Sequence, residues 1–440
     1  MNFLMRQNKN YHLHNFYNFF INLFSLLIKV YPKHDKLKKS YELKKHSLKQ
    51  LENYFLSQDK NNNFIHFHVA SAGELLQAYP LIKIFKKNNY KILLTYTSIS
   101  AKIWIDKRSH DLEAIDYSTS LPIDNKSNME VFFKLFRPKV IIFTKFDLWP
   151  GLIFYAYNLE IPIYLVSATL YKNSKRSVNY LSKLFFNQVY LCFHKIFCCT
   201  EEDKLNFDSN TNKLNNLLIT GDTRIDNVIE RSKIKCEYYF ENFEEDVFIA
   251  GSLWPKDMES ILNGLLNGLR NFKRFKVIIT YHDVSEETSN SIEQKFDDFP
   301  TIRLSNIKNM IPDNARVIIN DKLGILASLY ELGHLAYIGG GFTTGVHNVM
   351  EPCAKGLCSI FGPKYNNAPE VVGLVHKKIG FSINSESQFS QIISNYFNDK
   401  KTFHELGRLS KDYVESLSGA SEKCFQNIKK DMDYVENAIC

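Results

Sequence analysis

Short apolar runs rich in β-branched and aromatic residues alternate with amphipathic stretches from residue 64 onward. In the first half of the chain the runs that predict strands are FIHFHVA (64–70), KILLTYT (91–97), KVIIFTK (139–145), IPIYLVSA (161–168), KIFCCT (195–200) and NLLITG (216–221). Between the first two lies LLQAYPLIKIFKKNN, whose apolar residues recur at helical spacing. This alternation is typical of βα units on a parallel sheet.

The alternation pauses and then restarts. Residues 230–245 are charged and lack strong periodicity, and strand runs return at 246–252, 275–281, 315–320, 334–340 and 357–362, followed by helical residues from about 387 to 440. A chain of 440 residues exceeds what one hydrophobic core usually serves. We therefore predict an α/β fold of two Rossmann-like domains, residues 46–235 and 236–440, with ligands at the carboxyl ends of the strands.

The N-terminal segment has a different pattern. Residues 15–31 are apolar and aromatic but include Asn18 and Asn22, and the uninterrupted part is shorter than the roughly 20 residues of a spanning helix. The lysines that follow are Lys29, Lys33, Lys36, Lys38, Lys39, Lys44, Lys45 and Lys49. An apolar run followed by positive charge, without a cleavage site, predicts a membrane-associated segment over residues 1–45 and a cytoplasmic location for the rest. The alternative is an amphipathic helix packed on the protein's own surface.

Composition narrows the classes of partner. Hydrophobic residues make up 45% of the chain and charged residues 23%, and the formal net charge is +8. No nucleic-acid-binding motif accompanies this charge, so nucleic acid is disfavoured as a partner. The eight cysteines form no CxxC pair and no cluster at zinc spacing, so we expect reduced thiols and no metal site.

The first candidate for a catalytic motif is VASAGELLQAYPLI, residues 69–82. A buried strand ends in small residues, and Glu74 opens the following helix, with Ser71 in the same turn. A carboxylate in a first helical turn is usually a capping or dipole-stabilising residue. At the end of a parallel strand, it also lies where a general base for a hydroxyl group would be needed.

A second motif is IGGGFTTGVHNVMEP, residues 338–352. Its glycines, including Gly340 and Gly341, predict backbone amides that are free to approach a phosphate, with a helix beginning near His347. Asn348 and Glu351 are candidates for holding a base or a ribose. The motif lacks the GxGxxG and GxxxxGK[ST] patterns, which disfavours nicotinamide cofactors and Walker-type ATP binding. The alternative is an ordinary βα turn.

Three further positions are weaker candidates. In TKFDLWPG (144–151), Lys145 and Asp147 either pair with each other or meet a charged acceptor. In ITGDTRIDNV (219–228), Arg224 either meets a phosphate or pairs with a nearby aspartate. His282 follows the second strand run of the C-terminal domain, where a lone histidine is more often structural than functional.

Several motifs in register resemble one family. SAGE (71–74), DLWPG, GDTRID (221–226), IAGS (249–252), GVHNVMEP and FGPKYNN (361–367) are similar to segments of the 3-deoxy-D-manno-octulosonic acid (Kdo) transferases of lipopolysaccharide assembly. The resemblance implies a GT-B architecture with two domains facing across a cleft. It also implies an inverting transfer from CMP-Kdo to the lipid A precursor at the cytoplasmic face of the inner membrane, without a metal ion or another cofactor.

The resemblance assigns roles by position. Glu74 matches the family's general base, which takes the proton from a glucosamine 6′-hydroxyl. The positions that match donor contacts are His282, Leu323, Gly324, Ile325, Asn348, Val349, Met350 and Glu351. Many members carry glutamate at the positions of Lys145 and Asp147, and Pro-Arg-His where this chain has Tyr281, His282 and Asp283. The alternatives are a UDP-sugar-dependent GT-B transferase or epimerase, and a membrane-tethered scaffold without catalysis.

Overall fold

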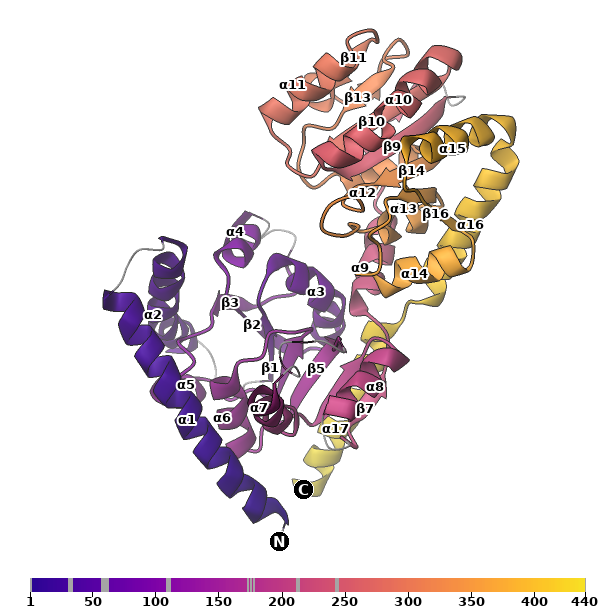
Figure 1. The fold of residues 1–440 in the computed structure, drawn as a ribbon. Helices are drawn as coiled ribbons and strands as arrows, with labels where there is room; N and C mark the ends of the chain where they lie inside the picture. Colours follow the sequence, from indigo (N-terminus) through magenta and orange to yellow (C-terminus); the bar gives the residue numbers. More distant parts are fainter. Residues whose placement is uncertain are drawn as a thin grey trace. The chain divides into compact units, whose positions relative to one another are not determined.

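The structure is a computed structural model, which describes residues 2–30, 35–56, 63–107, 112–171, 174, 176, 179–210, 214–241 and 245–439. The chain forms two compact units (Figure 1). Unit 1 comprises Met1–Asn227 and Ser418–Cys440, and unit 2 comprises Val228–Leu417. Each unit is built on its own seven-stranded parallel sheet, as far as the described residues extend.

In unit 1 the sheet has the strand order β3-β2-β1-β4-β5-β6-β7. The strands are β1 (Phe64–Val69), β2 (Lys91–Tyr96), β3 (Tyr117–Ser120), β4 (Val140–Thr144), β5 (Ile163–Ala168), β6 (Lys195–Cys198) and β7 (Leu217–Ile219). The six strands predicted for this part of the chain are confirmed, and β3 is an addition. The order reverses between β1 and β4, and ligands of open parallel sheets usually bind beside the loops that follow the strands at such a reversal.

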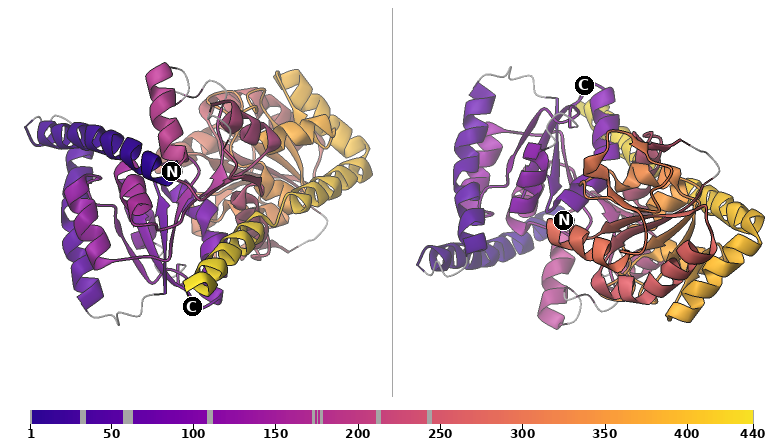
Figure 2. Two further views of the ribbon diagram at one scale, coloured as in Figure 1. Left: turned by 90° about the horizontal axis from the view of Figure 1, so that it is seen from below. Right: turned by 90° about the horizontal axis from the view of Figure 1, so that it is seen from above.

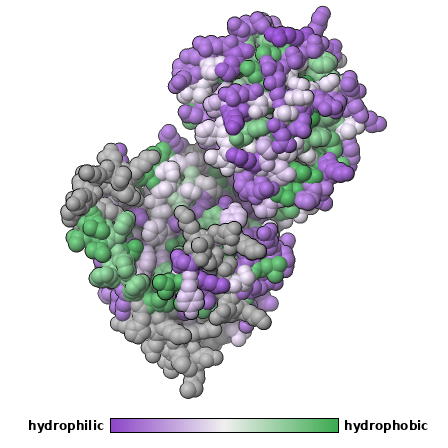
Figure 3. Space-filling model, viewed as in Figure 1, coloured by the Kyte–Doolittle hydropathy of each residue, from purple (hydrophilic) through white to green (hydrophobic). Residues whose placement is uncertain are grey.

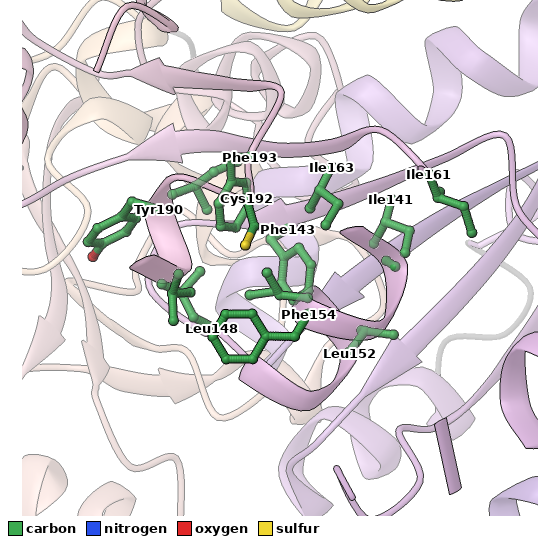
Figure 4. Close-up of a cluster of buried hydrophobic side chains, with 14 of the residues drawn as sticks. Ile141, Phe143, Leu148, Leu152, Phe154, Ile161, Ile163, Tyr190, Cys192 and Phe193 are labelled. Atoms are coloured by element: carbon green, nitrogen blue, oxygen red, sulfur yellow. The ribbon is translucent and has the colours of Figure 1, made fainter. Parts of the chain in front are cut away.

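Helices cover both faces of this sheet. They are α1 (Asn2–Val30), α2 (Asp35–Leu56), α3 (Ala72–Lys87), α4 (Ile99–Lys107), α5 (Lys126–Leu135), α6 (Pro150–Asn158), α7 (Tyr180–Tyr190), α8 (Glu201–Asn210), α9 (Thr223–Ser232), which continues into unit 2, and α17 (Ala420–Ile439). Alternate strand residues enter two separate apolar clusters, with Ile141 in one and Ile142 in the other. Figure 4 shows part of the cluster that contains Ile141, with Phe143, Phe154 and Phe193 among its labelled side chains.

In unit 2 the strand order is β11-β13-β10-β9-β14-β15-β16. The strands are β9 (Asp246–Leu253), β10 (Phe275–Tyr281), β11 (Thr301–Arg303), β13 (Val317–Ile319), β14 (Leu335–Ile338), β15 (Cys358–Phe361) and β16 (Gly380–Ser382), with a separate pair β8 (Tyr239–Phe240) and β12 (Met310–Ile311). The helices are α10 (Pro255–Asn271), α11 (Glu286–Lys295), α12 (Leu326–Leu329), α13 (Met350–Ala354), α14 (Pro369–His376), α15 (Glu386–Asn398) and α16 (Lys400–Ser416). Here the order reverses between β9 and β14.

The chain leaves unit 1 within α9 and returns to it after α16. The sequence expectation assigns all the terminal helices to the second domain, whereas α17 packs along α3 of unit 1 (Figure 2). Phe425 of α17 meets Phe85 of α3 at 5.0 Å between ring centroids. The Asp226 carboxylate accepts hydrogen bonds from the amides of Gly419 and Ser421, at 2.6 and 2.7 Å. Asp226 thereby fixes the start of α17 beside α9.

One side of α1 is bound to unit 1 by polar contacts. Tyr17 donates to the buried Asp124 carboxylate at 2.7 Å, and the oxygen of Asn18 accepts from the amide of Lys126 at 2.8 Å. Asn22 accepts from Asn125 at 2.9 Å. The two asparagines that interrupt the apolar run are therefore partners of the protein itself.

The other side of α1 is exposed and apolar. Its outward side chains are Phe16, Phe19, Phe20, Leu23, Phe24, Leu26 and Leu27. Figure 3 shows apolar side chains gathered over this helix. Among the described residues, no helix combines the length and hydropathy needed to cross a bilayer. Of the predicted lysines, Lys33 lies outside the described residues, and the side chains of Lys29, Lys36 and Lys38 are not described.

Candidate functional site

Glu74 lies at the carboxyl end of β1, in the first turn of α3. Ser71 caps this helix by accepting a hydrogen bond from the Glu74 amide at 3.4 Å, and the Glu74 carboxylate accepts from the Ala70 amide at 2.5 Å. The side chain is 8% exposed. Both residues therefore perform the capping function that their positions suggest.

The electrostatics of Glu74 go beyond capping. Burial raises the pKa of Glu74 to about 7, and the hydrogen bond from Ala70 only partly opposes this effect. Asp147 raises the pKa further, whereas Lys145 and Arg176 lower it. An acid that served only to cap a helix would be stabilised in its charged form. A pKa near neutrality is the property that a general base requires.

Asp147 follows β4, on the other side of the reversal in strand order. It accepts hydrogen bonds from Trp149 at 2.7 Å and from Thr97 at 3.3 Å, and His68 of β1 lies 3.3 Å away. Burial disfavours the charged form of Asp147, but these hydrogen bonds outweigh it and hold its pKa below the ordinary value. Asp147 is thus bound to neighbouring strands rather than to Lys145, which has a left-handed φ of 62° at the strand end.

A chain of buried polar groups backs Asp147. The second ring nitrogen of His68 lies 2.8 Å from the hydroxyl of Thr95, which is also 2.7 Å from a ring nitrogen of His66. Both histidines are fully buried. Burial lowers the pKa of each ring, and the hydrogen bond to Asp147 limits the effect at His68. The sequence motifs did not single out His68, because a histidine within a strand run carries no signal of its partner.

Arg224 lies near Asp222, 3.7 Å away, at the start of α9. The Asp222 carboxylate also accepts from Gln77 at 2.6 Å, one helical turn after Glu74 on α3. Of the two interpretations left open by the sequence, the ion pair with a nearby aspartate is the one observed.

In unit 2, the glycine-rich turn follows β14, at the reversal in strand order. Gly340 has a φ of +93°, and a Cβ there would lie 2.3 Å from the carbonyl oxygen of Gly345. The expectation of free amides is wrong at four positions, because Gly339, Gly340, Gly345 and His347 all donate to groups of the protein. The expected helix also begins later, at Met350, and spans only five residues.

Asp257, in the first turn of α10, supports this turn. The carboxylate is fully buried and accepts from the Gly340 amide at 2.8 Å, the Trp254 amide at 3.0 Å and the Tyr337 hydroxyl at 3.0 Å. No sequence motif distinguishes this residue, because an acid three positions after a helix start is typical of ordinary capping. Asp257 also joins the ends of β9 and β14, because it accepts from Trp254 and from Gly340.

His282 lies in a stack of three rings at the same edge. Its ring centroid is 4.6 Å from Trp254 and 4.6 Å from His347. Trp254 donates to a ring nitrogen of His347 at 2.9 Å, which requires that nitrogen to be unprotonated. Burial, followed by the neighbouring His282, lowers the pKa of His347 and favours this neutral form. Loops after β9, β10 and β14 thus converge on one aromatic cluster.

Two of the remaining donor candidates, Gly324 and Ile325, line a cavity of about 180 Å³ in unit 2. Its lining includes Gly324, Ile325 and Arg231, and Arg231 pairs with Glu351 at 3.3 Å. Leu323 beside them is 74% exposed. No sequence motif distinguishes Arg231, which lies in the charged stretch 230–245 that lacks periodicity.

The segment from Asn348 to Glu351 contains two apolar residues with buried side chains and two polar residues. Val349 and Met350 have fully buried side chains, so only their backbone can meet a ligand. The side-chain oxygen of Asn348 is buried and has no hydrogen-bond partner among the described residues. Buried polar atoms are rarely left unpaired, so this oxygen is a candidate binding position. Across the described part of the chain, no group of three or more His, Cys, Asp or Glu is arranged to hold a metal ion.

Comparisons with known proteins agree on one family. A family model described as 3-Deoxy-D-manno-octulosonic-acid transferase (kdotransferase) matches residues 44–227. The 3-deoxy-D-manno-octulosonic acid transferase of Aquifex aeolicus is 28% identical, over 76% of this chain and 86% of the relative. The corresponding transferase of Rickettsia bellii is 26% identical, over 83% of this chain and 86% of the relative.

Solved structures support the fold class. A putative UDP-N-acetylglucosamine 2-epimerase from Listeria monocytogenes has a TM-score of 0.60 at 11% identity, covering 85% of this chain and 97% of that one. The UDP-GlcNAc 2-epimerase from Neisseria meningitidis has a TM-score of 0.59 at 14% identity, covering 83% and 100%. At such identities the likeness concerns the fold alone. It confirms the α/β class with parallel sheets.

Proposed function

Because the chain belongs to the 3-deoxy-D-manno-octulosonic acid (Kdo) transferase family, we propose that it transfers Kdo from CMP-Kdo to the lipid A precursor, lipid IV(A). The observation that carries the assignment of the base is the carboxylate of Glu74, buried at the reversal of strand order in unit 1 with a pKa near 7. A group with this pKa is half-ionised near neutrality and accepts a proton efficiently there.

In the proposed step, the 6′-hydroxyl oxygen of a glucosamine unit attacks the anomeric carbon of Kdo. Glu74 accepts the hydroxyl proton as the new carbon–oxygen bond forms. The bond between the anomeric carbon and the phosphate oxygen breaks, and its electron pair leaves with CMP. Attack from the face opposite the leaving group inverts the configuration at that carbon.

Donor binding is assigned to unit 2. The unpaired oxygen of Asn348 suits an amino or hydroxyl donor of the nucleotide, and Glu351 suits ribose hydroxyls. Arg231, which pairs with Glu351, supplies a cation for the phosphate. Gly340 and Gly341 shape the turn beside this site, and their contribution is close backbone approach rather than a nest of free amides.

The acceptor is assigned to unit 1. The positive charge of Lys145 lowers the pKa of Glu74, so Lys145 lies near enough to the proposed base to be the candidate contact for a phosphorylated acceptor. Asp147 and Arg224 are assigned supporting roles, since each is held by neighbouring side chains. Ser71 is assigned to the cap that fixes the helix carrying Glu74.

The competing function is a UDP-sugar-dependent transferase or epimerase. Thermal unfolding with CMP and with UDP at equal concentrations distinguishes the two: we expect CMP to raise the melting temperature and UDP to have little effect. Incubation with CMP-Kdo and lipid IV(A) should then yield a lipid product heavier by Kdo, measured by mass spectrometry. Stabilisation by UDP alone, with no heavier lipid, would contradict the proposal.

We also propose that the exposed apolar side of α1 binds the cytoplasmic face of the inner membrane. Replacing Phe20 and Phe24 by glutamate should reduce flotation with phosphatidylglycerol-containing vesicles by roughly tenfold or more, because charges replace apolar groups at the interface. Val131→Glu is the control, since Val131 is 44% exposed on α5. If the double variant floats like the wild type, α1 is not the membrane contact.

A further inference from the structure

A second helix of unit 1 turns apolar side chains outward. In α7, Leu181 is 77% exposed, Tyr180 is 75% exposed and Leu184 is 43% exposed. The other end of the helix is anchored in the core by Val189 and Tyr190. Single exposed apolar residues are normal on soluble proteins, but three within five positions of one short helix indicate a surface that is covered in use.

This apolar end of α7 is continuous with α1. The ring of Tyr17 on α1 stacks with Phe185 on α7 at 6.2 Å, and Phe185 meets Phe154 of α6 at 6.3 Å. His14 of α1 packs against the same Phe154 at 5.8 Å. Leu181 precedes Phe185 by one helical turn, so it projects from the same side of α7 as the residue that contacts α1.

Charge identifies the class of partner. The two longest stretches of the chain without aspartate or glutamate are residues 1–34 and 161–200, and these contain α1 and α7 respectively. Among the described cations of the second stretch, Lys183 lies on α7 and Arg176 contacts Tyr190 of the same helix, whereas Lys195 pairs with Asp431. An apolar surface accompanied by positive charge, with carboxylates excluded from both segments, suits an anionic lipid interface.

We propose that the N-terminal half of α7 is a second membrane-contacting element, which together with α1 seats unit 1 on an anionic bilayer. The inference rests on the membrane association proposed for α1 but not on the transfer chemistry. Arg176 links this element to the site, because its guanidinium donates to the carbonyl of Phe146, between Lys145 and Asp147, and to the hydroxyl of Tyr190 at 3.2 Å. These hydrogen bonds join the loop after β4 to the C-terminal end of α7.

The first test measures vesicle binding of the full-length protein. Leu181→Glu combined with Leu184→Glu should weaken flotation with phosphatidylcholine vesicles containing phosphatidylglycerol by roughly tenfold, because glutamate opposes both insertion and the anionic surface. Leu205→Glu on α8 is the matched control, since Leu205 is 60% exposed, and should leave flotation unchanged. Equal flotation of the α7 double variant and the control would overturn the proposal.

The second test does not depend on a charged substitution. In Leu181→Trp, the added fluorescence should shift to shorter wavelength with the vesicles and be quenched by brominated acyl chains, whereas Leu205→Trp should show neither effect. A shift that follows protein concentration without vesicles would identify a second copy of the chain as the partner and reject the bilayer. Kdo transfer to a short-chain, water-soluble acceptor should be unchanged in the α7 variants, so failure of the membrane contact is distinguishable from failure of the proposed activity.

Discussion

Replacing Glu74 by glutamine is expected to lower the turnover number at least roughly 100-fold, the usual effect of losing a general base. Glutamine retains the size of the side chain, and its oxygen can still accept from the Ala70 amide. The substitution therefore removes basicity without removing the cap. Initial rates of Kdo transfer, with both substrates saturating, provide the measurement. Glu201→Gln is the control, since Glu201 occupies the first turn of α8, and near-normal turnover of the Glu74 variant would reject the assignment.

The same residue fixes an expected pH dependence. The base must be deprotonated, so kcat/KM of the wild type should rise with pH along a limb with an apparent pKa near 7. The stability of the fold changes with pH in the opposite direction to the activity. Because folding raises the pKa of Glu74 from 4.5 to about 7, the contribution of this residue to the free energy of unfolding is fully present below pH 4.5 and is lost as pH rises through 7. Glu74→Gln should therefore be at least as stable as the wild type at pH 8. If the Glu74→Gln variant has low activity and an unchanged free energy of unfolding, the loss of activity comes from catalysis and not from folding.

Replacing Asp257 by alanine is expected to give the largest loss of stability among the polar residues near the two sites. The substitution leaves three donors without their acceptor, namely the amides of Trp254 and Gly340 and the hydroxyl of Tyr337, and the last two are buried. Since each buried unsatisfied group costs about 1 to 3 kcal/mol, we expect a decrease of about 3 kcal/mol or more in the free energy of unfolding of unit 2. Urea denaturation provides the measurement.

The variant should also bind CMP more weakly, because the turn at Gly340 loses its support. Asp298→Asn is the control in the same unit: Asp298 pairs with Arg270 on the surface and is 67% exposed, so its loss should change stability by less than about 1 kcal/mol. If Asp257→Ala retains both stability and CMP affinity, the turn does not depend on this carboxylate.

The features predicted from sequence were those with local signals. Buried strand runs identified the sheets, and Glu74 could be placed at the end of β1 because a strand followed by small residues and a helix start has a recognisable pattern. β3 escaped because its sequence, YSTS, is short and polar, and its position is set by pairing with β2. The roles of these residues in catalysis remain predictions.

Contacts between distant segments had no such signal. The sequence places Asp147 two positions after Lys145, but the hydrogen-bond partners that lower its pKa come from β1, from the residue after β2 and from its own loop. The glycines after β14 suggested free amides, whereas several of those amides close the turn on itself. Asn18 and Asn22 looked like interruptions of an apolar helix, although each binds a residue more than 100 positions away. Tertiary pairing decided each of these cases.

The return of α17 to unit 1 sets the order in which the chain can be completed during synthesis. The apolar side of α3 that contacts Phe425 and Ile428 is synthesised early. Helix α17, which carries these two residues, emerges from the ribosome only after all of unit 2. The apolar side of α3 in unit 1 therefore stays uncovered until α17 has been synthesised. A chain that stops near residue 418 would contain all of unit 2. It would lack α17, so the apolar side of α3 in unit 1 would stay exposed.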